Sequence, residues 1–306
     1  MSQIVKTDAF SDFDDLLANE LLSDPWTHSL GDKPRYDPDF RLLARLLAIP
    51  VGDKQASESG RFARAIDAWV AQELRRAGFS ADEVWPRATR PRVLPRDIAV
   101  LLEKLPRKLS AEVAIRLPDI AAVGPVDAKV LGRAYEKQVD VCVARWERGP
   151  ELLVSTKAQV RSFGKNLPNR FEEAYGDAGN LRGRYPLASV GFLFVQRSTI
   201  LEQEPEAFER AIDMIRKLRD LGDGNGYTAT GLVLVDWDDP PRPGTPVWVR
   251  EHEVPDDVAA AQFFASLIGR AIEVAPISHH VQVRAQIERR HIPVRESDTV
   301  HEDQDH

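Results

Sequence analysis

In the first 110 or so residues, apolar side chains recur three or four positions apart, the spacing of a helix with one buried face. The pattern predicts helices over residues 40–49 and 60–79. Another short helix is predicted within 94–109, while prolines keep the segment 87–96 out of a regular helix. The apolar stripe of the second helix consists of Phe62, Ile66, Trp69, Val70 and Leu74.

From about residue 124 the spacing of the apolar positions changes. Residues 124–138 are expected to form a helix with Pro125 near its first turn. Residues 139–146 alternate between apolar and polar positions, and 151–160 form a second such run after a short Gly-Pro turn. Two runs joined in this way predict an antiparallel hairpin.

Two uninterrupted apolar runs, 187–196 and 227–237, are typical of strands covered on both faces. An amphipathic helix over 205–222 lies between them, and a last helix is predicted over 256–272. The order of elements predicts an α/β fold with a mixed central sheet flanked by helices, preceded by a mainly helical region. The expected divisions are a helical region over 1–115, an α/β domain over 116–290 and a polar, disordered tail over 291–306.

Composition narrows the class of protein. The chain has 306 residues, is 43% hydrophobic and 29% charged, and has no apolar run approaching the roughly 20 residues that span a bilayer. The first residues lack the pattern of a signal peptide, and the single cysteine, Cys142, excludes an intrachain disulfide. A cytoplasmic protein with no membrane partner is therefore expected. The net charge of -7 argues against a uniformly basic surface but leaves room for local basic patches.

The candidate chemistry lies on the predicted hairpin. Lys157 follows the apolar half of the second strand with no turn residue between, and burying an ammonium group is costly unless it is paired or used. Asp140 opens the first strand, so pairing of the two strands would bring it near Lys157. Ser155, Lys157 and Gln159 alternate onto one face of the second strand.

At these residues the chain resembles the PD-(D/E)XK nuclease superfamily, the fold of many restriction endonucleases. Asp140 matches the aspartate that opens a strand, Glu136 the acid of the leading helix, and S-T-K (155–157) stands where E-x-K would be. The resemblance covers roughly residues 124–240. It implies a restriction-endonuclease-like fold and an enzyme that hydrolyses the phosphodiester bonds of DNA.

The resemblance also implies a metal site and a role for each residue. Mg²⁺, with Mn²⁺ as the alternative, would be held by Asp140 and the carbonyl of Thr156, because Mg²⁺ prefers carboxylates, carbonyls and water. Lys157 would orient the attacking water and steady the scissile phosphate. Gln159 would hydrogen-bond a phosphate or the water.

Ser155 stands in place of the second carboxylate of the family pattern. Three explanations are open: the carboxylate has moved to the following helix, at Glu172 or Glu173; Glu136 supplies it; or catalysis is lost and DNA binding is kept. The first two predict a metal-dependent DNA endonuclease of restriction or phage-defence type. The third predicts a catalytically inactive DNA-binding or adaptor subunit of a defence complex.

Basic residues near the strand favour a polyanionic partner. Residues 157–184 hold six lysines and arginines against three acids, in a chain that is acidic overall. Segment 87–96 has four arginines and no acid, and could contact the duplex. A homodimer, or a place in a restriction or defence complex, follows from the resemblance alone. The predicted nucleic-acid contacts are Arg161, Lys165, Asn166, Arg170, Arg90 and Arg92.

Overall fold

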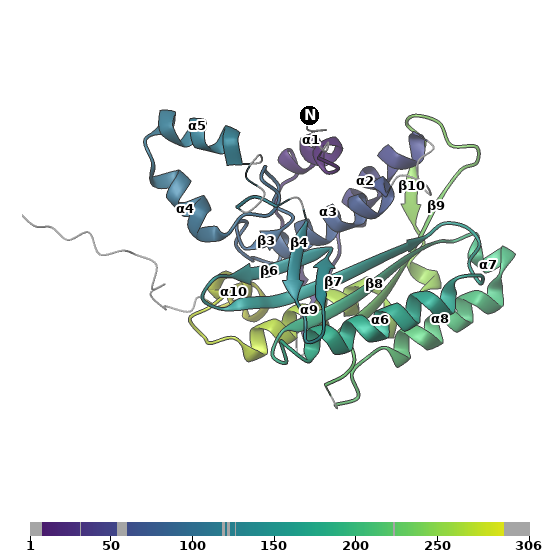
Figure 1. Ribbon diagram of the computed structural model, residues 1–306. Coiled ribbons are helices and arrows are strands. Elements are labelled where there is room, and N and C mark those ends of the chain that lie inside the picture. Colours follow the sequence, from purple (N-terminus) through teal and green to yellow (C-terminus); the bar gives the residue numbers. More distant parts are fainter. Residues whose placement is uncertain are drawn as a thin grey trace, which may run out of the picture.

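The chain folds around one six-stranded sheet with the strand order β10-β9-β8-β7-β6-β3 (Figure 1). This computed structural model describes residues 8–30, 32–53, 60–117, 120, 123–125, 127–222 and 224–290. The predicted tail 291–306 lies outside the described residues. The strands are β3 (Val84–Trp85), β6 (Val141–Arg145), β7 (Gly149–Gln159), β8 (Ser189–Arg197), β9 (Ala229–Trp237) and β10 (Val247–Val249).

The sheet is mixed, as the order of elements predicts. Strands β7, β8 and β9 run parallel to one another, while β10, β6 and β3 pair antiparallel with their neighbours. Two of these parallel strands, β8 and β9, are the ones with uninterrupted apolar runs, because both of their faces are covered. The class of α/β protein with a mixed central sheet flanked by helices is therefore confirmed.

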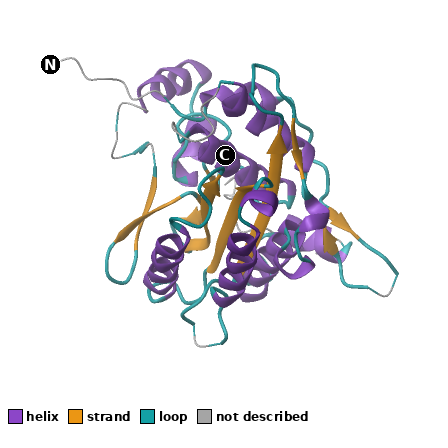
Figure 2. Cartoon of the chain, turned by 90° about the vertical axis from the view of Figure 1, so that its right-hand side faces the viewer, coloured by secondary structure: helices purple, strands orange, loops and turns teal. Residues whose placement is uncertain are grey.

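Helices cover both faces of the sheet (Figures 1 and 2). One face packs against α2 (Phe40–Gly52), α3 (Arg61–Arg76) and α9 (Ala260–Val274). The other packs against α6 (Leu167–Arg182) and α8 (Pro205–Lys217). Each face has its own hydrophobic core, and the sheet separates the two.

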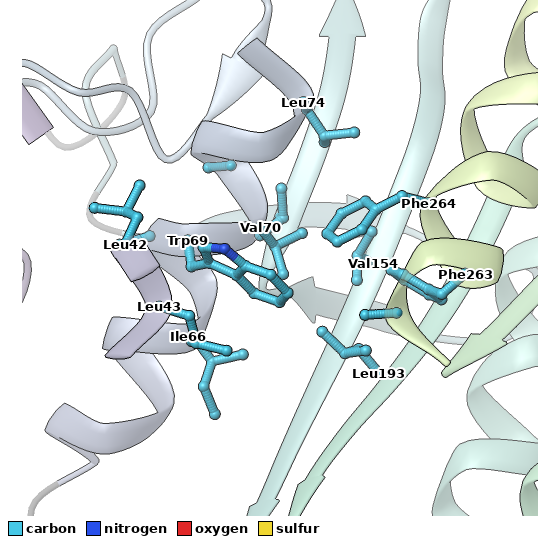
Figure 3. Close-up of a cluster of buried hydrophobic side chains, with 14 of the residues drawn as sticks. Leu42, Leu43, Ile66, Trp69, Val70, Leu74, Val154, Leu193, Phe263 and Phe264 are labelled. Carbon is cyan, nitrogen blue, oxygen red and sulfur yellow. The ribbon is translucent and has the colours of Figure 1, made fainter. Parts of the chain in front are cut away.

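The predicted apolar stripe of residues 60–79 is the buried face of α3. Figure 3 shows Ile66, Trp69 and Val70 of α3 beside leucines of α2, with Phe264 of α9 and Val154 of β7 across from them. Helices α2 and α3 and strand β3 therefore share one core with the α/β part of the chain. This packing brings α3 against the strand that carries Lys157.

The remaining elements lie around this centre. No helix within the described ranges is long and apolar enough to cross a membrane. The smaller helices are α1 (Asp14–Ala18), α4 (Arg96–Lys104), α5 (Arg107–Arg116), α7 (Ile200–Gln203) and α10 (Val281–Glu288), with 3₁₀ turns at Ser11–Phe13, Glu251–Glu253 and Asp256–Val258. Two small antiparallel pairs complete the fold, β1 (Trp26–Thr27) with β2 (Arg35–Tyr36) and β4 (Ala128–Leu131) with β5 (Glu136–Val139).

The helix predicted over 124–138 is wrong, because that stretch contains the hairpin β4–β5. Burial alternates along β4, with Ala128 and Val130 inside, which is a period of two and not of 3.6. The turn packs closely on α6: a Cβ added at Gly132 would lie 2.1 Å from the side chain of Asn180. By contrast, the hairpin predicted over 139–160 is confirmed as β6 and β7.

Candidate active site

The candidate site begins where β7 runs past the end of β6. Val141 pairs with Val154, so the second half of β7 extends beyond the first residue of β6. Asp140 lies at this step, and its backbone N–H donates to the carbonyl of Val154 (3.2 Å). The Asp140 carboxylate accepts a hydrogen bond from the backbone N–H of Thr156 (2.8 Å). The strand register thus holds Asp140 beside the predicted motif.

A second carboxylate, not among the predicted site residues, comes from α3. Asp67 is 2% exposed, and its Oδ1 accepts a hydrogen bond from the Thr156 hydroxyl (2.6 Å). Thr156 therefore contacts two carboxylates, Asp140 through its N–H and Asp67 through its hydroxyl. The signal in the sequence is an aspartate set between Ile66 and Trp69, in the middle of an apolar stripe.

Their environment raises the pKa of both carboxylates. Burial raises the pKa of Asp67, and the charge of Asp140 raises it further. The hydrogen bond from the Thr156 hydroxyl and the charge of Arg64, 3.4 Å from Asp67, lower this pKa but do not outweigh the rise. Burial also raises the pKa of Asp140, although the Thr156 N–H and the cations Lys157, Arg64 and Lys137 oppose it. Such a pair gains stability from a proton or from a metal cation.

Lys157 lies on the face of β7 that is turned toward α6, opposite to the face that carries the Thr156 side chain. Its Nζ donates to Oε1 of Glu173 (3.1 Å), and its side chain is 22% exposed. Although burial acts in the opposite direction, the hydrogen bond and charge of Lys157 lower the pKa of Glu173. Of the two glutamates predicted to replace the missing acid, Glu173 thus contacts the motif. Glu172 is exposed and lines a groove between α6 and α8 instead.

Hairpin β4–β5 adds a second lysine. Lys137 lies 2.5 Å from Asp177 and 3.7 Å from Glu173, both on α6. Asn180 holds the hairpin in place, because its amide accepts from the backbone N–H of Ala134 (2.8 Å) and donates to the carbonyl of Tyr135 (3.1 Å). The lysine ammonium groups and the α6 carboxylates form a continuous chain of ion pairs.

Glu136 is not brought to Asp140. It lies on β5 with its side chain 59% exposed, paired with Lys129 of the neighbouring strand at 3.4 Å. Its predicted place as the acid of a leading helix is wrong, because the residue is on a strand. The helix acid that does reach the site is Asp67.

Ser155 and Gln159 are both buried and serve the fold. Ser155 is 4% exposed and faces Tyr227, whose pKa is raised by burial and by the charge of Asp177 and lowered by the Ser155 hydroxyl. The Gln159 amide donates to the carbonyls of Ser162 and Phe163 (both 2.9 Å) and accepts from Gln196 (3.2 Å). Gln159 therefore closes the turn after β7 and has its amide engaged in the protein.

The predicted nucleic-acid contacts fall into two groups. Arg161, Lys165 and Asn166 are exposed on the loop after β7, and Arg170 is half-buried in the first turns of α6.

Two arginines of segment 87–96, Arg90 and Arg92, are tied to acids near the N-terminus. Arg92 is 5% exposed and pairs with Asp8 (2.8 Å) and Asp14 (2.7 Å). Arg90 is exposed but also pairs with Asp8 (2.7 Å). The structure thus places Arg92 inside the protein, where a nucleic acid cannot contact it.

No family model, curated protein or solved structure matches the chain. Across the described ranges, no group of three or more histidines, cysteines, aspartates or glutamates is arranged to hold a metal ion. The interpretation of the site therefore depends on Asp67, Asp140, Thr156 and Lys157 themselves.

Proposed function

We propose that the protein is a metal-dependent phosphodiesterase acting on DNA, a nuclease of restriction or phage-defence type with a restriction-endonuclease-like core. The observation that carries this proposal is the pair of buried carboxylates, Asp67 and Asp140, hydrogen-bonded to Thr156 next to Lys157. A helix acid, an aspartate at a strand start and a strand lysine are three parts of the family pattern, and Ser155 stands in place of its remaining acid. Asp67 takes the place that the sequence analysis assigned to Glu136.

The donor set fits Mg²⁺ or Mn²⁺. Asp67 and Asp140 supply oxygen ligands, and the carbonyl of Thr156 points to the same side of β7 as its N–H, which faces Asp140. Mg²⁺ commonly binds one or two carboxylates and keeps several waters, so a site with two acids suits it. When bound, the metal would activate water and neutralise charge on the phosphate.

The residues on the α6 side would handle the substrate. Lys157 is positioned by its hydrogen bond to Glu173 and would hold the scissile phosphate. Lys137 adds a second positive charge within reach of the same glutamate. Since Glu173 contacts Lys157, its function in this proposal is to orient the lysine.

The alternative is a catalytically inactive DNA-binding or adaptor subunit of a restriction or defence complex. Ser155 favours it, because the position of the usual second acid on β7 holds a buried hydroxyl that faces Tyr227. This alternative predicts salt-dependent DNA binding that needs no divalent metal and survives Asp140→Ala. A cytoplasmic location and a homodimer belong to the same set of proposals.

The deciding experiment is a cleavage assay. Purified protein is incubated with plasmid DNA, phage DNA and RNA plus Mg²⁺ or Mn²⁺, beside Asp140→Ala and Lys157→Ala. Glu136→Ala is the matched control, because it removes an exposed acid from the adjacent hairpin. We expect both site variants to lose cleavage and the control to keep it. A wild type that binds DNA at low salt but cuts no substrate supports the adaptor instead.

A further inference from the structure

A small basic pocket opens at the end of β7, separate from the carboxylate pair. Its volume is about 150 Å³, and its lining contains two arginines, three neutral polar side chains and no acid. We call it the β7-end pocket. It is lined by Ala158, Gln159, Val160, Arg161, Ser162, Asn166 and Arg170.

The β7-end pocket adjoins the proposed site. Gln159 lies two residues beyond Lys157 on the same face of β7, which is about 7 Å along a strand. The charge of Arg170 lowers the pKa of Glu173, the residue that holds Lys157. A polyanion lying over Lys157 would therefore also reach the arginines of the pocket.

The walls of the pocket are fixed by hydrogen bonds. Gln159 donates to the carbonyls of Ser162 and Phe163, and Glu204 accepts from the backbone N–H groups of Phe163 (2.9 Å) and Gly164 (2.7 Å), so the loop after β7 is held in place. Asn166 is the N-cap residue of α6, so the positive end of that helix adds to the field of the pocket. Such a preformed basic pocket loses little freedom when it binds an anion.

One donor in the pocket lacks a protein partner. Within the described residues, Nε of Arg170 is buried and makes no hydrogen bond. The Arg170 guanidinium therefore keeps donor capacity that the fold does not use, and such a half-buried cation in a pocket wall gains from a ligand that accepts its hydrogen bonds. Phosphoryl oxygens are suitable acceptors, since arginine matches their geometry and charge.

We propose that the β7-end pocket binds a phosphoryl group, and that in function this group is a backbone phosphate of the nucleic-acid strand held at Lys157. The assignment of the strand phosphate rests on the proposed function. A second pocket close by, lined by Gly164, Glu204, Glu206 and Arg210, offers a contrast. Its two glutamates make it unsuitable for an anion, and its exposed arginine provides a matched control.

The test measures DNA binding by fluorescence anisotropy in EDTA, so that no metal-dependent cleavage takes place. A labelled duplex is titrated at several salt concentrations with wild type, Arg170→Gln, Arg161→Gln, Arg170→Lys and the control Arg210→Gln. We expect each pocket substitution to glutamine to raise the Kd about tenfold and to lower the slope of log Kd against log salt by about 1. Arg170→Lys should keep the slope, since it keeps the charge, and Arg210→Gln should change neither quantity.

A second titration separates the two sources of phosphate. Inorganic phosphate is added at constant ionic strength while the melting temperature is followed. Phosphate should raise it for the wild type and not for Arg170→Gln. That result with unchanged DNA binding would assign the pocket to free phosphate and overturn the strand assignment. Unchanged Kd and slope in both glutamine variants, with no effect of phosphate, would overturn the whole proposal.

The outcome is independent of catalysis. If the pocket variants weaken DNA binding but the wild type cuts no DNA, the phosphate pocket is supported and the proposed nuclease activity is contradicted. If the wild type cuts DNA but neither arginine substitution changes DNA binding, the nuclease activity is supported and the phosphate pocket is contradicted.

Discussion

Helix α3 carries two buried carboxylates with opposite surroundings. Asp67 is 2% exposed and Glu73 is not exposed at all, yet both lie on the same helix. Glu73 accepts from the Tyr36 hydroxyl (2.9 Å), the Asp39 N–H (3.2 Å) and Arg76 (2.7 Å). Each of these partners is a donor that opposes the cost of burying the Glu73 charge.

Asp67 has fewer donors and a like charge beside it. It accepts from the Thr156 hydroxyl, has Arg64 at 3.4 Å, and interacts unfavourably with Asp140. Burial raises the pKa of both α3 acids, that of Glu73 to about 7 even though Arg76, Tyr36 and the Asp39 N–H oppose it. A raised pKa alone therefore does not mark a functional site. The uncompensated like charge distinguishes Asp67.

The largest contrast is expected in catalysis. Asp67→Asn should lower the DNA cleavage rate by more than about 100-fold, since losing a group that merely supports a metal ligand costs 10–100-fold. Glu73→Gln should leave the DNA cleavage rate unchanged, provided that the assay temperature is well below the melting temperature of this variant. The measurement is cleavage of plasmid DNA with Mg²⁺. Equal losses in both variants would show that the two acids do not differ in the way proposed.

The contrast should reverse for stability. Glu73→Ala should lower the free energy of unfolding by about 3–5 kcal/mol, because it leaves the buried Arg76 guanidinium without its partner. Asp67→Asn should raise this free energy, because the amide has nearly the same size and no charge to repel Asp140. Urea denaturation near pH 7 measures both. A destabilised Asp67→Asn protein would contradict the assignment of an uncompensated pair.

The pH dependence of stability should contain a contribution from Glu73. Its pKa is about 7 in the folded protein against 4.5 for an unperturbed glutamate, so the folded state keeps a proton that the unfolded state releases. The contribution of Glu73 to the free energy of unfolding is therefore largest below pH 4.5. It falls by about 3 kcal/mol as the pH rises to 7. In Glu73→Gln the slope of unfolding free energy against pH between pH 4.5 and 7 should be smaller by the amount that one proton contributes. An unchanged slope would mean that Glu73 stays ionised throughout.

The smallest expected effect is that of the metal on stability. Mg²⁺ at ten times its Kd should stabilise the wild type by about 1.4 kcal/mol. Asp140→Asn should lose this increment, whereas Glu73→Gln should keep it, since the Asp67–Asp140 pair would bind the metal and Glu73 lies outside the proposed site. Melting curves with and without Mg²⁺ decide the point. A shift that persists in Asp140→Asn would place the metal elsewhere.

The parts of the site that lie close together in sequence could be predicted. Asp140 and Lys157 flank one hairpin, and the alternation of residues 139–160 with its Gly-Pro turn predicts that hairpin locally. Placement of Lys157 on the face opposite to Thr156 also follows from the period of two along a strand. Glu173 was predicted as a possible replacement for the missing carboxylate, and in the structure it contacts Lys157.

Prediction was wrong where local signals were weak. Residues 128–139 have no strong turn signal, and their hairpin is held by Asn180 of α6. The pattern therefore predicts Glu136 to be a helix acid, whereas it lies on strand β5 with an exposed side chain.

The sequence by itself determined the α/β class, the buried parallel strands and the pairing of β6 with β7, because these follow from apolar periodicity and short turns. Only the tertiary structure decided which acid joins Asp140. Thr156 and Asp67 are 89 positions apart in the chain, and they meet because the apolar stripe of α3 packs on β7. Side-chain periodicity predicts that α3 has a buried face but not which strand that face covers, so the contact of Asp67 with Thr156 could be found only in the folded chain.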